Sequence, residues 1–215
     1  MKGIVWEDGR YRPLNGGYAA RFSERFGVEV CNRSHFGYTV RKGAVLLQRM
    51  LERGGGDGDI VLLEYGGNDC DFDWEAVAAD PQGRHNPKTS PEEFCELYGR
   101  LVSMLQSRGM RVALMTLPPI DAQRYLGWVA PEEHKRRSVL RWLGDSQVIY
   151  RFQEMYSGLA AKVAAQTGAL LADIRPAFLT QHDMGSLLCR DGIHPNAAGH
   201  ALIFDTLCEI AQSNL

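Results

Sequence analysis

The feature that most limits the fold of this sequence is the alternation of short apolar runs, rich in β-branched residues, with longer segments of helical period. Apolar runs occupy residues 28–31, 60–63, 111–116 and 169–174. The run at 60–63 is apolar without interruption, as in parallel strands that are buried on both faces. Strands that alternate with helices in this order predict an α/β fold, a three-layer α/β/α sandwich with a mostly parallel sheet.

The segments between the runs carry helix signals. Ser90, Pro91 and Glu93 have the residue types of an N-cap, an N1 position and an N3 position, and Glu93 is expected to return a hydrogen bond to the cap. Helical spacing of apolar residues predicts helices over residues 18–26, ending at Gly27, over 40–51, ending at the glycines 54–56, over about 148–166, and from about residue 196 onward.

Length and composition exclude several classes of protein. A chain of 215 residues without a repeat or a linker is expected to be a single domain over residues 1–215. Its 24 Lys and Arg against 26 Asp and Glu leave a formal charge of -2, which disfavours a nucleic-acid partner. No apolar run approaches the roughly 20 residues of a membrane span. The five cysteines form no C-x-x-C pair, so we expect reduced thiols, no metal site and a cytoplasmic location.

The most distinctive chemistry follows the last apolar run, at residues 191–196. Asp191 precedes His194 by three residues in a tight turn, where its carboxylate can accept the imidazole Nδ1–H. This bond fixes the tautomer whose Nε2 is free to act as a general base. Pro195 keeps His194 extended and out of the next helix. Asp191 and His194 are therefore candidate catalytic residues.

Two loops at other strand ends carry candidate donors for developing negative charge. Gly37 leaves a backbone N–H open to a substrate oxygen, although a loop glycine also serves simple turns. Asn68 follows the run at 60–63 and offers a neutral amide donor, although it can equally cap its own turn.

In combination, these blocks resemble the SGNH hydrolases, also called the GDSL-type esterase and lipase family. The resemblance rests on three motif blocks that occur in the family's order. They are residues 32–39, which include Gly37, residues 66–69, which include Asn68, and residues 191–195. It implies a flavodoxin-like sheet and a carboxylic-ester hydrolase that uses no metal or cofactor and acts on small-molecule esters. It further implies a serine nucleophile, His194 as base, Asp191 as its orienter, and an oxyanion hole formed by Gly37 and Asn68.

The first block of the family is missing. It contains the nucleophile in a Gly-Asp-Ser-x-x-x-Gly pattern at the end of the first strand, whereas this chain has no serine before Ser23. If Gly3 is the last glycine of the block, the nucleophile lies two residues upstream of Met1. We therefore expect the first strand and its serine to precede Met1, and the sheet to lack one strand between residues 28–31 and 60–63.

Two serines within the chain are alternatives. Ser146 stands in a Gly-Asp-Ser triplet, but a helix-like stretch precedes it and we expect it to cap the next helix. Ser34, inside the second block, is a weaker candidate. The rival function is a non-catalytic binding module on the same fold. The sequence leaves the acyl group, the alcohol and the oligomeric state undetermined.

Overall fold

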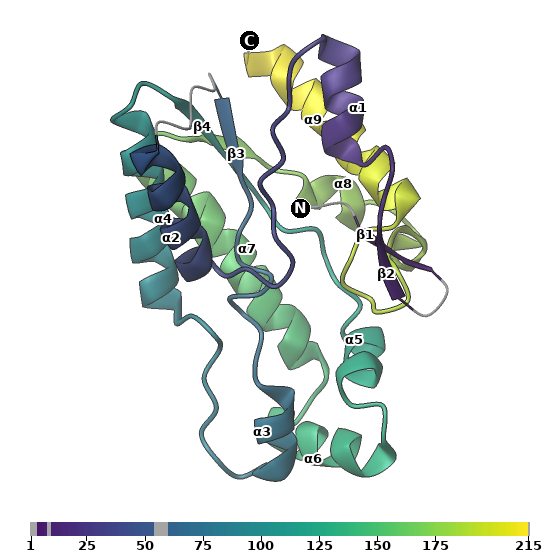
Figure 1. The fold of residues 1–215 in the computed structure, drawn as a ribbon. Helices are drawn as coiled ribbons and strands as arrows, with labels where there is room; N and C mark the ends of the chain where they lie inside the picture. The colour runs from purple at the N-terminus through teal and green to yellow at the C-terminus, as the bar shows by residue number, and fades with distance from the viewer. Residues whose placement is uncertain (1–3, 8–9, 54–59, 215) are drawn as a thin grey trace.

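The fold is described from a computed structural model, over residues 4–7, 10–53 and 60–214 (Figure 1). The strands are β1 (Ile4–Glu7), β2 (Arg10–Pro13), β3 (Ile60–Leu63), β4 (Arg111–Met115) and β5 (Leu170–Ala172). The helices are α1 (Tyr18–Phe26), α2 (Val40–Glu52), α3 (Trp74–Ala79), α4 (Pro91–Gln106), α5 (Ala122–Val129), α6 (Glu133–Leu143), α7 (Gln147–Thr167), α8 (Arg175–Leu179) and α9 (Ala197–Asn214), with a 3-10 turn at Met184–Leu187.

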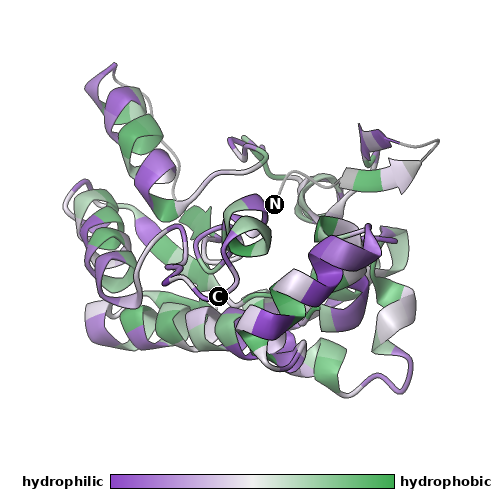
Figure 2. Ribbon diagram, turned by 90° about the horizontal axis from the view of Figure 1, so that it is seen from below, coloured by the Kyte–Doolittle hydropathy of each residue, from purple (hydrophilic) through white to green (hydrophobic). Residues whose placement is uncertain are grey.

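The main sheet is parallel, in the order β3-β4-β5, and has helices on both faces. Residues alternate along β4, so that Val112 and Leu114 pack into one cluster with α2, α4 and α7. Met115 belongs to a second cluster with α1, α8 and α9. Figure 1 shows these two helix groups on opposite sides of the strands, and Figure 2 shows that the helices carry both hydrophobic and hydrophilic stretches. The prediction of a three-layer α/β/α sandwich is confirmed.

Most of the predicted helix starts and ends agree with the structure. α1 covers the predicted residues and ends at Gly27, whose φ of 62° suits glycine. The Ser90 hydroxyl caps α4 by accepting the Glu93 N–H at 3.3 Å. The return bond from Glu93 is absent, because its carboxylate instead accepts from the Arg41 guanidinium on α2, at 2.6 Å from Nη2 to Oε1. The glycines 54–56, predicted to end α2, lie outside the described residues.

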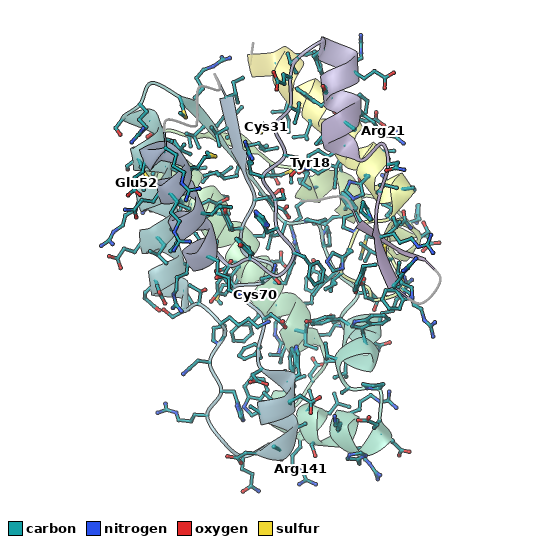
Figure 3. The ribbon with its side chains drawn as sticks, in the orientation of Figure 1. Tyr18, Arg21, Cys31, Glu52, Cys70 and Arg141 are labelled. Atoms are coloured by element: carbon teal, nitrogen blue, oxygen red, sulfur yellow. The ribbon has the colours of Figure 1, made fainter. Side chains whose placement is uncertain are left out.

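The predicted strand at residues 28–31 is wrong. This segment has no regular secondary structure, and Val28 and Val30 are 44% and 39% exposed. Figure 3 labels Cys31 on the segment that runs from α1 to α2. A strand forms only where a neighbouring strand satisfies its backbone groups. Within the described residues β3 pairs with β4 alone, and Ile60 on β3 is 49% exposed, so no partner lies beside that edge.

An N-terminal hairpin is a feature that the sequence reasoning missed. β1 and β2 pair antiparallel, with Trp6 opposite Tyr11. The signal was present, because Asp8-Gly9 separates two short runs by two residues, which is a common hairpin spacing. This hairpin brings its aromatic side chains to the loop that carries His194.

A third hydrophobic cluster joins α3, α5 and α6 beyond the carboxyl end of the sheet, at the lower end of Figure 1. All five cysteines are unpaired; Cys70 and Cys189 are buried, whereas Cys31 is exposed. In the part of the chain that the structure describes, no helix has the length and apolar character needed to cross a membrane.

Replacing His200 with phenylalanine is expected to make the protein less sensitive to acid. His200 is fully buried on α9 and stacks on Tyr18 at 5.6 Å, and its ring nitrogens have no hydrogen-bond partner among the described residues. Burial lowers its pKa to about 4. Between this value and the unfolded value of ~6.5, the unfolded chain takes up the proton and the folded chain does not, so stability falls by up to about 1.4 kcal/mol per pH unit as the pH decreases.

The measurement is urea unfolding at pH 8 and pH 5. His200→Phe should lose less stability than the wild type between the two pH values, whereas replacing the exposed His134 should leave the difference unchanged. Equal losses in His200→Phe and the wild type would show that His200 does not cause the acid sensitivity.

Candidate active site

The loop before α9 holds Asp191 in a fixed turn. Its Oδ1 accepts the N–H groups of Ile193 at 3.0 Å and His194 at 3.1 Å. Gly192 has a φ of 76°, and a Cβ there would lie 2.8 Å from the backbone oxygen of Asp121. This position therefore requires glycine. The Asp121 N–H donates to the Gly192 oxygen at 2.8 Å, which ties the turn to the start of α5.

Asp191 and His194 form the hydrogen-bonded pair that the sequence predicts. The imidazole Nδ1 lies 2.7 Å from Asp191 Oδ2, and the carboxylate is fully buried while 20% of the His194 side chain is exposed. Burial alone raises the pKa of Asp191, but hydrogen bonds from His194, Tyr11 and the Ile193 N–H outweigh it and lower the pKa to about 2. Nε2 of His194 has no hydrogen-bond partner among the described residues, so it is available to take a proton.

Aromatic side chains surround the imidazole. Phe36, from the loop before α2, stacks on His194 with centroids 5.8 Å apart, and the Tyr11 ring meets His194 edge-on at 5.3 Å. Trp6 and Trp128 extend this group, with their centroids 4.7 Å apart. Phe36 is 62% exposed, so one side of the group opens to solvent. An apolar, partly open surface beside a base suits the acyl or alcohol part of an ester.

The loops that carry Gly37 and Asn68 are tied together by Asp69. This buried carboxylate accepts the Val40 N–H at 2.9 Å, the Thr89 hydroxyl at 2.7 Å and the Gly66 N–H at 3.0 Å. Burial raises its pKa, and these hydrogen bonds partly offset that effect. Phe36, four residues before Val40, stacks on His194, so the segment that carries Gly37 contacts both the loop of Asn68 and the loop of His194.

The two candidate donors have suitable local geometry. Gly37 sits in a turn with a φ of 71°, and a Cβ added there would meet nothing within 4 Å, so its surroundings are open. Asn68 is half-buried, and its side chain makes no hydrogen bond within the described ranges. Its amide is therefore not used up by capping its own turn.

Neither alternative nucleophile, Ser146 or Ser34, makes a hydrogen bond to His194 among the described residues. Ser146 is at the junction of α6 and α7, where Asp145, not Ser146, caps α7 by accepting the Gln147 N–H at 3.0 Å. The backbone N–H of Ser34 donates to Asn32 Oδ1 at 3.0 Å in a local turn. Burial raises the pKa of the Cys70 and Cys189 thiols, which disfavours a reactive thiolate.

Three residues of the site were not predicted: Tyr11, Phe36 and Asp69. Asp69 stands next to Asn68, but nothing in the sequence shows which N–H groups its carboxylate accepts. Tyr11 lies 180 positions from Asp191, and only the hairpin signal pointed to an ordered segment there. Among the described residues, no group of three or more His, Cys, Asp or Glu side chains is arranged to hold a metal ion.

Comparisons with known proteins bear on the family and the fold of this chain. The model of the GDSL-like lipase/acylhydrolase family matches residues 4–202. Among solved structures, LAE5, an alpha/beta hydrolase from the metagenome of Lake Arreo, Spain, is 25% identical, with a TM-score of 0.63 over 91% of this chain and 81% of that chain. The lipase/acylhydrolase from Enterococcus faecalis is 19% identical, with a TM-score of 0.61 over 92% and 84%. The acetyl xylan esterase AlAXEase is 21% identical, with a TM-score of 0.60 over 90% of each chain. No curated protein sequence matches significantly.

Proposed function

Because the chain belongs to the GDSL-like lipase/acylhydrolase family, and is thereby an SGNH-type ester hydrolase, we propose that Asp191 and His194 are the orienter and the base of its reaction. The observation that carries this assignment is the 2.7 Å contact from Nδ1 of His194 to Asp191 Oδ2, in a side chain that is 20% exposed and whose Nε2 has no hydrogen-bond partner among the described residues. We place the substrate among small-molecule carboxylic esters, with no metal and no cofactor in the reaction, and treat residues 1–215 as one domain.

The proposed reaction proceeds through an acyl-enzyme. A serine oxygen attacks the ester carbonyl carbon while Nε2 of His194 takes the hydroxyl proton, and the carbonyl oxygen becomes an oxyanion. The Gly37 N–H and the Asn68 amide donate hydrogen bonds to this oxyanion. The intermediate then collapses, and His194 returns the proton to the departing alcohol oxygen. His194 then takes a proton from water as the water oxygen attacks the acyl-enzyme carbonyl. The bond to the serine oxygen breaks, the carboxylic acid leaves, and His194 returns the proton to the serine oxygen.

The nucleophile in this proposal is a serine on a segment preceding Met1, two residues upstream if Gly3 ends the first block. Two observations support this position. Nε2 of His194 has no serine hydroxyl as a hydrogen-bond partner among the described residues. The edge of β3 opposite β4 is unpaired within the same residues, and residues 28–31 form no strand, as expected where a neighbouring strand is lacking.

The charge and the thiols support two further assignments. The net charge of -2 gives no attraction to nucleic acid. Five unpaired cysteines suit a reducing compartment, and we propose a cytoplasmic location.

A fluorophosphonate probe tests the function, because it labels only an activated serine. The 215-residue chain is expected to show little or no labelling and little hydrolysis of p-nitrophenyl acetate. A form that includes the upstream in-frame residues should show both, and replacing His194 with glutamine in that form should remove both.

Each other outcome contradicts a specific part of the proposal. Robust labelling of the 215-residue chain would place the nucleophile within it, and loss of labelling in Ser146→Ala or Ser34→Ala would identify it. An in-frame stop codon directly upstream of Met1 would rule out the upstream serine. An extended form that carries the serine but does not react would favour a binding module without turnover.

A further inference from the structure

We propose that Tyr11 is a positioning residue of this site: its hydroxyl shares Asp191 Oδ2 with His194 and thereby sets how strongly the carboxylate draws a proton onto the imidazole. This inference rests on the proposed roles of Asp191 and His194. It adds a third member to that pair, from the N-terminal hairpin.

The Tyr11 hydroxyl donates to Asp191 Oδ2 at 2.5 Å, and this is the same oxygen that lies 2.7 Å from Nδ1 of His194. Oδ1 is already occupied by two backbone N–H groups of the turn. Tyr11 is therefore the one side chain besides His194 that donates to this carboxylate among the described residues. Burial, followed by the bond to Asp191, raises the pKa of Tyr11, so the hydroxyl keeps its proton and remains a donor.

The hairpin gives the Tyr11 ring little freedom. Trp6, opposite Tyr11 in the hairpin, packs edge-on against it at 4.8 Å, and Phe36 contacts it at 5.5 Å. The same ring meets the His194 imidazole edge-on at 5.3 Å with an interplanar angle of 66°. Tyr11 thus restrains the orientation of the imidazole through its ring and the charge of the carboxylate through its hydroxyl.

Few other charged or titratable groups face Asp191. The Cys189 thiol lies close enough to interact with both Asp191 and Tyr11, and burial raises its pKa, so it stays neutral. Arg124 on α5, whose Cβ lies against Gly192, is paired with Asp121 at 3.0 Å and donates to the Gly185 oxygen at 2.9 Å. His200 on α9 interacts with His194, and burial lowers the pKa of His200. Among the hydrogen bonds that lower the pKa of Asp191, the bond from the Tyr11 hydroxyl is second only to the bond from His194.

A hydroxyl donor to Oδ2 draws electron density away from the Asp191–His194 bond. Removing that donor leaves more negative charge facing Nδ1–H, which favours the protonated imidazole. The base then becomes available only at higher pH. A residue with a packing role alone has no such effect when its ring is kept.

Tyr11→Phe removes the hydroxyl and keeps the ring. The matched control is Tyr125→Phe, which removes a second tyrosine hydroxyl that donates to an aspartate, Asp71, at 2.8 Å. The first readout uses the 215-residue chain and needs no turnover: the proton NMR resonance of His194 Nδ1–H, identified by its loss in His194→Gln. It should move downfield in Tyr11→Phe and stay in place in Tyr125→Phe.

The second readout uses the form that hydrolyses p-nitrophenyl acetate. In Tyr11→Phe the acid limb of the kcat/KM profile should shift to higher pH by about half a unit to one unit, and kcat at neutral pH should fall about 3- to 10-fold with KM within about twofold. Thermal unfolding of both variants confirms that they fold.

An unchanged Nδ1–H resonance together with an unchanged acid limb would overturn the role of Tyr11. If the resonance moves but no form of the protein hydrolyses esters, the hydroxyl acts as proposed and the proposed function fails instead. A resonance that moves equally in Tyr125→Phe would also contradict the proposal, because the effect would then not be specific to the contact with Asp191.

Discussion

Asp191→Asn is expected to lower kcat of the hydrolytically competent form by about 10⁴-fold, with little change in KM. The asparagine amide has one acceptor atom where the carboxylate has two. The Tyr11 hydroxyl, His194 Nδ1–H and two backbone N–H groups all point at this side chain. If the amide oxygen accepts the backbone N–H groups of Ile193 and His194, the amide NH₂ faces Nδ1 of His194. The imidazole then carries its proton on Nε2, which cannot act as a base.

Asp121→Asn is the matched control for this variant. Asp121 also caps a helix beside the loop, and its backbone N–H, which the substitution retains, donates to the Gly192 oxygen. Loss of the capping charge should reduce stability by about 0.5–1 kcal/mol and leave kcat within about threefold. An Asp191→Asn enzyme that keeps more than a tenth of the wild-type kcat would contradict the role assigned to Asp191.

The pH dependence separates Asp191 from the base that it orients. With a folded pKa of about 2, Asp191 is ionised at every pH at which an esterase is assayed. Its contribution to stability is fully present above the unfolded pKa of ~3.9 and is lost as the pH falls toward the folded pKa. An acid limb in the pH profile of hydrolysis therefore does not report on Asp191.

Local patterns were sufficient to predict most of the fold. The Ser90-Pro91 start of α4 and the glycine end of α1 depend on contacts within one turn of the chain, and both appear where expected. The prediction of a strand at residues 28–31 was wrong because strand formation depends on a neighbouring strand, and a local sequence pattern carries no information about that neighbour. An apolar, β-branched run is necessary for a strand in such a sheet, but it is not sufficient.

In the candidate site too, contacts between residues close in sequence were predictable and contacts between distant residues were not. Asp191 and His194 are three residues apart, so their contact follows from one turn and was predictable. Tyr11 and Asp69 reach partners across long stretches of chain, with 180 positions from Tyr11 to Asp191 and 29 from Asp69 to Val40. Such contacts depend on how whole helices and strands pack. A tyrosine or an aspartate has many other roles in proteins, so the residue type alone does not predict its partner.

Asp69→Asn is expected to reduce both stability and activity, because Asp69 fixes the two loops that carry the proposed oxyanion donors. Its two oxygens accept the N–H groups of Val40 and Gly66 and the Thr89 hydroxyl while fully buried. An amide in its place points an NH₂ at one of these N–H groups, and an unsatisfied buried donor costs about 1–3 kcal/mol. With the loops displaced, kcat should fall about 10²-fold or more through the oxyanion hole. Urea unfolding and esterase assays measure the two effects.

Asp71→Asn distinguishes loss of stability from loss of the oxyanion geometry. Asp71 is two residues away and accepts from Trp74 Nε1 and the Tyr125 hydroxyl, both at 2.8 Å, but it contacts neither Val40 nor Gly66. Its replacement should likewise destabilise the protein, yet kcat per folded molecule should stay within about threefold because both donor loops remain tied together. If Asp71→Asn lowers kcat as much as Asp69→Asn does, the effect belongs to general destabilisation. Asp69 would then have no special part in placing Gly37 and Asn68, and the oxyanion assignment would lose its structural support.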